Sequence, residues 1–277
     1  MLKKILFLFL LVVSIDQLQA QNQNISDKLV KNYTPNSWWL NLRYDHFLKT
    51  GSYFYLENNN RFNLEPAFGE SFPFNSLYRT YVWAGYEHKA HEKWYLGLSQ
   101  KYVAIKNRDS WYSKVNITHR GKLSKLAFIK EVSLEHFRHP KSDNPNIIVE
   151  NEGRVTFAPA LVKTFTIQER PLYLLLSYRA SMLFDWNNDG FSSYSKRNID
   201  NTRLRFEVSH FLTQSLMLSV YAIRDTYYSY QLAQFDAFNN EIVPEARVNR
   251  ITPTFGMSLN YVFGKPEEGY LPAFPGK

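Results

Sequence analysis

Hydrophobic and polar residues alternate with a period of two along most of the chain after residue 36. In residues 38–45, Leu40, Leu42 and Tyr44 fall on one face, and Asn41 and Arg43 fall on the other. Successive side chains of a β-strand point to opposite sides, so this pattern predicts strands. Eleven segments show it: residues 38–45, 52–64, 77–88, 94–106, 111–120, 126–137, 154–166, 172–185, 202–212, 216–228 and 248–263.

The length of these segments favours a membrane barrel over a soluble sandwich. Most have ten or more residues, whereas strands of soluble proteins have about five or six, and a tilted strand needs about ten to cross a bilayer. The predicted fold class is therefore all-β, a transmembrane antiparallel β-barrel of about twelve strands, and the alternative is a secreted soluble β protein. Aromatic residues near segment ends suit the two membrane interfaces: Trp38, Trp39, Tyr53, Tyr86, Trp94, Tyr95, Trp111, Tyr112, Tyr227, Tyr228 and Tyr261.

Connections between the segments alternate in length, which predicts a topology. Five are short, at residues 48–51, 89–93, 121–125, 168–171 and 213–215, and four are long, at residues 65–76, 139–153, 186–201 and 229–247. Outer-membrane barrels have short periplasmic turns, longer extracellular loops and an even number of strands. Eleven segments therefore predict one cryptic twelfth strand within residues 24–33, unless the N-terminal segment threads the lumen to reach the outer face.

The N-terminal segment has the layout of a secretory signal. Lys3 and Lys4 precede an apolar run, residues 5–13, and a small residue stands at Ala20. The run is too short to span a bilayer as a helix. We expect cleavage after Ala20, secretion to the periplasm and integral localisation in the outer membrane. The predicted layout is a signal peptide (1–20), an N-terminal segment (21–36), a barrel (37–263) and a C-terminal tail (264–277).

Composition narrows the chemistry. The 277 residues include 33 Lys+Arg and 25 Asp+Glu, 44% are hydrophobic and none is Cys. This excludes a disordered chain, disulfides, thiolate metal sites and a Cys nucleophile. The basic residues alternate with apolar ones and form no exposed stripe, so no nucleic-acid partner is expected.

The last segment carries a candidate signal for insertion into the outer membrane. Residues 254–263 place Gly256 two positions after Thr254, followed by alternating apolar and aromatic residues that end in Phe263. This decapeptide resembles the terminal β-signal of outer-membrane proteins. The resemblance implies recognition by the outer-membrane insertion machinery through Gly256, Leu259, Tyr261 and Phe263, with outer-membrane lipid as the surrounding medium. An ordinary amphipathic strand is the alternative.

Short motifs distributed over residues 37–263 also resemble a known family. They are Trp38-Trp39, Arg61-Phe62, Ala84-Gly85-Tyr86, His119-Arg120 and Asn249-Arg250. Their layout is similar to that of the Bacteroidota outer-membrane barrels called domain of unknown function 2490. The resemblance implies an outer-membrane barrel and no known activity.

The polar face of the segments predicts a charged lumen. Its main charge row consists of Arg43, Arg61, Arg79, Arg154, Arg179, Arg203, Arg205, Glu207 and Arg250. Like charges repel in a confined space, so interleaved acidic and basic residues should pair and crowd the lumen. We expect a narrow or partly plugged barrel in which the arginines bias any leak toward anions.

Two further groups of residues are weaker candidates for a metal site and a catalytic site. Asp185, Asn187 and Asp189, followed by Gly190, match the start of a calcium loop, but Lys196 occupies the position of the bidentate Glu, and a plain turn is the alternative. His136, His139 and Ser142 could suggest a hydrolase, yet the chain lacks the His-x-Ser pattern of outer-membrane phospholipases. The sequence therefore predicts no catalytic residues and no cofactor besides this candidate Ca²⁺.

Three functions follow from these observations. The favoured one is a narrow pore or solute transporter with a charged, partly plugged lumen. The alternative is a structural or partner subunit of a cell-surface or secretion complex, with a surface protein as partner. An outer-membrane lipid hydrolase is the least favoured.

Overall fold

The computed structural model describes residues 29–34, 36–63, 77–105, 108–123, 126–138, 152–167, 169–185, 199–231 and 233–264. The predicted signal peptide and nearly all of the predicted C-terminal tail lie outside these residues. Among the described residues, no helix is long and apolar enough to cross a membrane.

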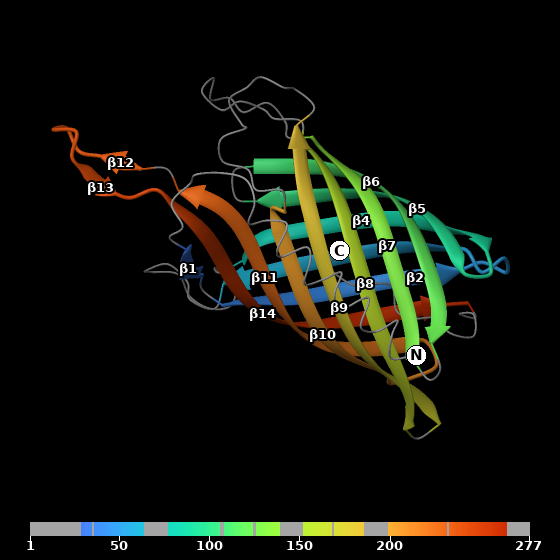
Figure 1. Cartoon of the computed structure of the whole chain (residues 1–277). Helices are drawn as coiled ribbons and strands as arrows, with labels where there is room; N and C mark the ends of the chain where they lie inside the picture. The colour runs from blue at the N-terminus through green and yellow to red at the C-terminus, as the bar shows by residue number, and fades with distance from the viewer. Residues whose placement is uncertain are drawn as a thin grey trace.

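Eleven strands form a closed barrel (Figure 1). Neighbours from β2 to β11 are antiparallel, as are β11 and β14. The all-β barrel prediction is confirmed, and every predicted segment is a strand. The strands are β2 (Ser37–Phe47), β3 (Tyr53–Asn63), β4 (Leu77–His91), β5 (Trp94–Ile105), β6 (Arg108–Leu123), β7 (Leu126–Arg138), β8 (Glu152–Ile167), β9 (Arg170–Asp185), β10 (Asn201–Phe211), β11 (Leu216–Gln231) and β14 (Ala246–Phe263).

The barrel closes through a parallel pair. Strand β14 pairs with β2 in parallel, from Thr254 opposite Ser37 to Phe263 opposite His46. With an odd number of alternating strands, the first and last run in the same direction, so only a parallel seam can close the sheet. The expectation of an antiparallel seam and an even number of barrel strands is therefore wrong.

The predicted cryptic strand exists but has a different role. Strand β1 (Leu29–Tyr33) lies within residues 24–33 and pairs with β14 in parallel, with Leu29 opposite Arg247 and Tyr33 opposite Ile251. The Thr34 amide donates to the Ile251 carbonyl over 3.0 Å. Strands β1 and β2 thus follow the same edge of β14, so β1 extends the seam and adds no twelfth strand to the barrel wall.

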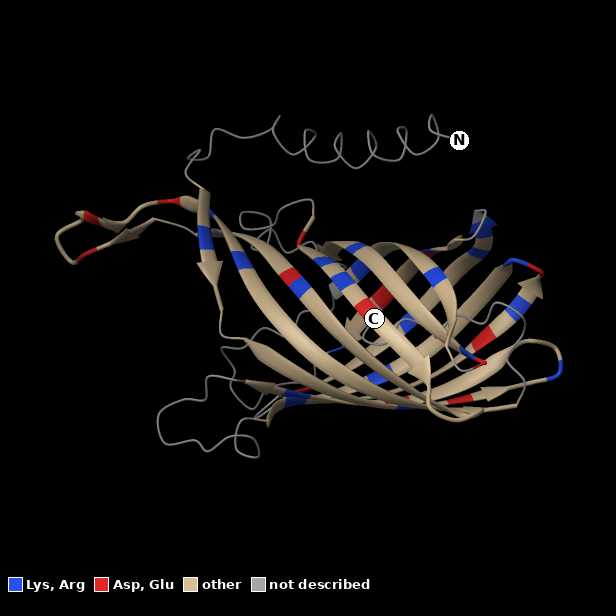
Figure 2. Cartoon of the chain, turned by 90° about the horizontal axis from the view of Figure 1, so that it is seen from below, with Lys and Arg blue, Asp and Glu red and all other residues tan. Residues whose placement is uncertain are grey.

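The two ends of the barrel differ in their connections. The short-turn end carries residues 48–52, 92–93, 124–125, 168–169 and 212–215. The long-loop end carries one short connection at residues 106–107, together with residues 64–76, 139–151, 186–200 and 232–245. In the last of these, the described residues form a small hairpin of β12 (Gln234–Phe235) and β13 (Glu241–Val243) that projects beyond the barrel (Figures 1 and 2). The alternation pattern did not predict this hairpin, because its strands have only two and three residues.

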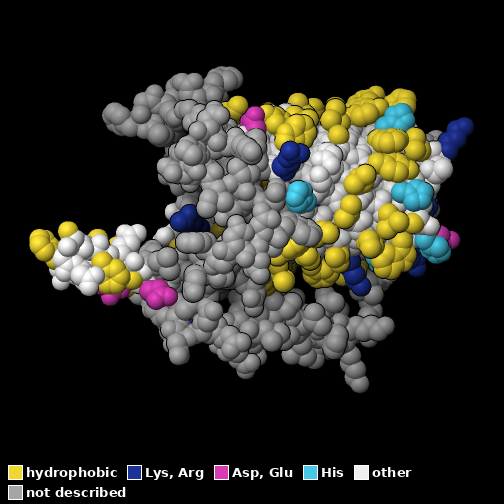
Figure 3. Space-filling model, turned by 90° about the horizontal axis from the view of Figure 1, so that it is seen from above, with side chains coloured by type: hydrophobic (Ala, Val, Ile, Leu, Met, Phe, Trp, Pro, Cys, Tyr) yellow, Lys and Arg dark blue, Asp and Glu magenta, His cyan; other side chains and the backbone are white. Residues whose placement is uncertain are grey.

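The wall is apolar outside and polar inside. Every barrel strand exposes a large apolar side chain on its outer face, and such side chains cover the side of the barrel visible in Figure 3. One example from each strand is Leu42, Leu56, Val82, Leu98, Val115, Leu134, Phe157, Leu176, Phe206, Val220 and Phe255. Each strand also buries a polar side chain inside: Arg43, Glu57, Glu87, Ser99, Lys114, Glu131, Thr156, Ser181, Glu207, Ser219 and Ser258.

One glycine of the last strand allows an aromatic ring to lie flat against the wall. Gly256 pairs with Tyr221 of β11, and a Cβ built on Gly256 would fall 2.3 Å from the Tyr221 ring. That distance is far inside van der Waals contact, so only glycine fits under the ring. Tyr221 in turn packs with Trp39 and Ile223 in the lumen.

Candidate functional site

The structure places most of the predicted charge row inside the barrel. Arg43, Arg61, Arg203, Arg205 and Glu207 are buried. Arg79, Arg154 and Arg179 are half-buried on the same inner face. Figure 2 shows these acidic and basic positions distributed along the strands.

Arg250 differs from these residues because it is exposed. It lies directly opposite Tyr227 of β11, in an uninterrupted antiparallel register that also places Thr252 opposite Asp225. Residues two apart in a strand share a face, so Arg250 is on the same face of β14 as Thr252, at the end of the barrel near the long loops. Its assignment to the lumen stays a prediction.

Apolar side chains fill the lumen at the short-turn end. They belong to residues that flank the turns, such as Phe47 and Tyr53 on either side of residues 48–52. We call this cluster the apolar plug, and its buried members are Phe47, Tyr53, Tyr55, Trp83, Phe211, Met217 and Val262. A second cluster of Ile129, Ala160, Val162 and Leu175 meets it through Tyr173. Together they pack the interior of the barrel at this end.

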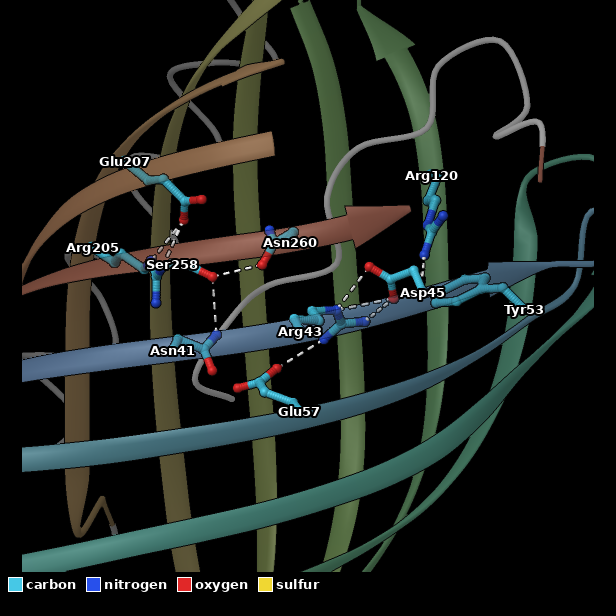
Figure 4. Close-up of polar contacts among 10 residues, drawn as sticks. All are labelled: Asn41, Arg43, Asp45, Tyr53, Glu57, Arg120, Arg205, Glu207, Ser258 and Asn260. Atoms are coloured by element: carbon cyan, nitrogen blue, oxygen red, sulfur yellow. Dashed lines mark hydrogen bonds and ion pairs between the residues drawn. The ribbon is translucent and has the colours of Figure 1, made fainter. Parts of the chain in front are cut away.

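Above the apolar plug, Arg43 joins two carboxylates (Figure 4). Its guanidinium lies 2.8 Å from Asp45 and 2.9 Å from Glu57, and it stacks on Tyr55 with its Cζ 4.4 Å from the ring centroid. All three charged side chains are at most 2% exposed. Charge-assisted hydrogen bonds of this kind are stronger than neutral ones, so they hold the three side chains in one arrangement.

Other buried polar groups complete this layer, which we call the paired network. Arg205 and Glu207 are 2.8 Å apart, and Lys114 and Glu131 are 2.6 Å apart. Arg120 of β6 donates to the Tyr53 hydroxyl of β3, two strands that do not pair. This hydrogen bond crosses the interior and connects the paired network to the apolar plug. The network consists of Asn41, Arg43, Asp45, Glu57, Lys114, Arg120, Glu131, Arg205, Glu207, Ser258 and Asn260.

Nearer the long loops, aromatic rings take the place of carboxylates as partners of the cations. The Arg61 guanidinium lies 3.4 Å from the centroid of Trp39, and Arg203 lies 5.0 Å from the same ring. Lys101 lies 4.9–5.1 Å from the rings of Tyr81, Trp83 and Tyr112. We call this layer the cationic cluster, and its members are Arg61, Arg79, Lys101, Arg154, Arg179 and Arg203.

Carboxylates are scarce in the cationic cluster. Asp225 binds Arg203 at 2.7 Å, and Arg154 approaches Glu135 at 3.5 Å and Asp200 at 4.0 Å. Within the described part of the chain, the other four cations form no ion pair. Among the described side chains, six cations thus face three carboxylates, which is an excess of positive charge.

Three aromatic residues that contact lumen arginines do not lie where the sequence predicted them. Trp39, Tyr53 and Tyr95 were predicted at the membrane interface, but all three are buried in the lumen. Trp38, Trp94, Trp111 and Tyr261 are exposed on the outer face, as predicted. Residues next to one another in a strand face opposite ways, so the parity of the flanking polar residues could have separated the two sets.

The remaining sequence candidates gain no structural support. Asp185 ends β9, while Asn187, Asp189, His139 and Ser142 lie outside the described residues, and His136 faces away from the lumen. No group of three metal-ligating side chains occurs among the residues that the structure describes.

Comparisons with known proteins add one structural likeness. No family model and no curated protein matches the chain, so the resemblance to domain of unknown function 2490 stays a prediction. Among solved structures, the chain is similar to the NanC porin at 11% identity and a TM-score of 0.40, over 77% of this chain and 90% of that chain. The strand pairing and the apolar exterior define a closed all-β barrel.

Proposed function

We propose that the protein is an integral outer-membrane barrel that acts as a narrow pore or solute transporter, closed at rest. The observation that carries this proposal is the reversal of polarity across the wall, with apolar side chains outside and ionised ones inside. Soluble monomers rarely expose contiguous apolar patches larger than a few hundred Å². A belt that includes all eleven barrel strands suits lipid, and a closed barrel leaves no strand edge unpaired in the bilayer.

The charged lumen supports transport over a purely mechanical role. Well-packed apolar side chains are often as stabilising as buried ion pairs, or more so, so a barrel that only served as an anchor could fill its interior with them. Arg43, Lys114 and Arg205 instead keep buried carboxylate partners. A polar lining lowers the barrier for water and polar solutes, while the apolar plug accounts for the resting closure.

Planar-bilayer recording tests the pore directly. The wild type should show little steady conductance. Arg203→Ala/Arg205→Ala removes bulk and leaves Asp225 and Glu207 without these cations, so conductance should rise, cation preference should increase and thermal stability should fall. Arg138→Ala/Arg224→Ala removes the same charge from the exposed outer face and should change conductance little. A large, steady, unselective wild-type current contradicts closure.

A partner subunit of a cell-surface or secretion complex is the second candidate, and the β12–β13 hairpin favours it. Phe235, Phe238 and Ile242 are 55%, 86% and 61% exposed there, beyond the barrel. The hairpin has an ordered tip, because Asp236 accepts hydrogen bonds from the amides of Asn240 and Phe238. Hydrogen bonds from Asn240, and then from Phe238, lower the pKa of Asp236. An exposed apolar tip of this kind is typical of a protein–protein contact.

Affinity purification from native membranes tests this second candidate. Wild type should retain a surface protein that Phe238→Ala loses, while Phe238→Tyr should retain it. No conductance in either the wild type or the arginine variant, together with Phe238-dependent retention, would move the conclusion to the partner function. Equal recovery by wild type and Phe238→Ala would remove the hairpin argument.

A further inference from the structure

Two pairs of arginines face each other across neighbouring strands in the cationic cluster. Arg61 of β3 lies directly opposite Arg79 of β4, and Arg203 of β10 lies directly opposite Arg179 of β9. All four side chains point into the lumen. Like charges directly opposite one another destabilise a sheet, and the two pairs flank Trp39, whose ring contacts both Arg61 and Arg203.

Buried donors in the same cluster lack acceptors. The Nε groups of Arg79, Arg154 and Arg179 are buried, and none of them has a hydrogen-bond partner among the residues that the structure describes. Arg79 donates from Nη1 to the Tyr81 hydroxyl, and Arg179 donates from Nη2 to the Asn201 side chain. A buried guanidinium donor without an acceptor is costly, more so than a neutral one. These three groups therefore present donors that an anion with several oxygens would satisfy.

The cations converge from different parts of the wall. Lys101 of β5 lies within electrostatic range of Arg61, Arg154 and Arg179, which come from β3, β8 and β9. These strands lie on different sides of the closed sheet, so their charges meet in the interior. Arg154 and Arg179 are half-buried and not fully enclosed, in contrast to the paired network below them.

We propose that the cationic cluster is a binding site for a small oxyanion, either a phosphate or a carboxylate. Its oxygens would accept from the free Nε donors and separate the charges of the two cross-strand arginine pairs. Guanidinium groups suit this role because their planar donors match the geometry of carboxylate and phosphate oxygens. The inference deepens the proposed function and rests on it, since it names the class of solute that the lumen would take.

Calorimetric titration of the purified full chain in zwitterionic detergent tests the site without requiring conductance. Inorganic phosphate is the first probe and succinate the second, each against sodium chloride at matched ionic strength. We expect saturable binding of at least one oxyanion and none for chloride. Arg179→Gln and Lys101→Met should each weaken binding about tenfold or more, as loss of one charge-assisted contact implies.

Arg138→Gln is the matched control, because it removes one positive charge from the outer face near the same end of the barrel, where Arg138 lies opposite the exposed Trp111. It should bind phosphate or succinate as the wild type does. Arg179→Gln should also melt at the same temperature as the wild type or higher without phosphate, since it relieves the repulsion with Arg203.

The outcomes separate this site from the pore. Binding that depends on Arg179 and Lys101 in a barrel without conductance would support the site and overturn the transport function. Absence of saturable binding for both oxyanions would overturn the site, as would equal weakening by Arg179→Gln and Arg138→Gln, whatever the conductance. Preference for phosphate over succinate, or the reverse, would identify which oxyanion the site accepts.

Discussion

Near the short turns, Arg43 contacts Asp45 and Glu57 at 2.8 and 2.9 Å, and the three side chains are almost fully enclosed. Near the long loops, Arg61 stacks on Trp39 and Arg179 donates to an amide oxygen. Both layers consist of inward-facing residues, and β3 and β10 contribute to both. Carboxylates pair with Arg43, Lys114 and Arg205 in the first layer. Among the described residues of the second layer they pair only with Arg154 and Arg203, which is why we propose that a solute binds there.

The largest expected effect comes from removing a cation of the paired network. Arg43→Met keeps much of the volume but leaves Asp45 and Glu57 without this partner. Breaking a buried ion pair on one side costs about 3–5 kcal/mol. Denaturant titration of the barrel in detergent should show a loss of this size, and a loss below about 1 kcal/mol would remove the distinction between the two layers.

The apolar plug should be nearly as sensitive. Met217 of β11 is fully buried among the other residues of the apolar plug. Truncation of a buried Met to Ala costs about 2–5 kcal/mol. Met217→Ala should lower the melting temperature and increase the frequency of openings in bilayer recordings. Unchanged gating together with lower stability would show that closure does not depend on the apolar plug.

Gly256 lies next to the paired network, on the side of the long loops, and it tests how tightly the wall packs against the lumen residues. Gly256→Ala forces the Tyr221 ring to move, and overpacking of this kind costs about 1–3 kcal/mol. Tyr221→Phe/Gly256→Ala should be no better, since it is the ring that conflicts with the new methyl group, whereas Tyr221→Ala/Gly256→Ala should recover part of the loss. Heat-modifiable migration on gels measures the folded fraction in each variant.

The smallest effect is expected in the cationic cluster. Arg79→Gln removes one member of an arginine pair and one hydrogen bond to Tyr81. These contributions oppose each other, so the unfolding free energy should change by less than about 1 kcal/mol. Thermal melts of Arg79→Gln and Arg43→Met, measured side by side, compare the two layers directly. A loss of stability in Arg79→Gln as large as that in Arg43→Met would refute the difference between the layers.

The sequence determined the wall of the barrel. Alternation with a period of two located all eleven barrel strands and assigned Arg43, Arg61, Arg203, Arg205 and Glu207 to one face, because a strand has only two faces. The contrast between short turns and long loops followed from the same segments. Only the tertiary structure decided how the wall closes: the pairing of β14 with β2 depends on strands more than 200 residues apart in the chain, and a local pattern carries no information about such a partner.

The contents of the lumen were likewise decided by the tertiary structure. Trp39 and Tyr53 are residue types that are common at membrane interfaces, yet both are buried inside the barrel. The sequence could not distinguish the two places, because an aromatic side chain suits a lipid boundary and a packed lumen equally well. Whether an inward arginine meets a carboxylate, as Arg43 does, or another arginine, as Arg179 does, depends on strand register, and register is set by the closure of the whole barrel.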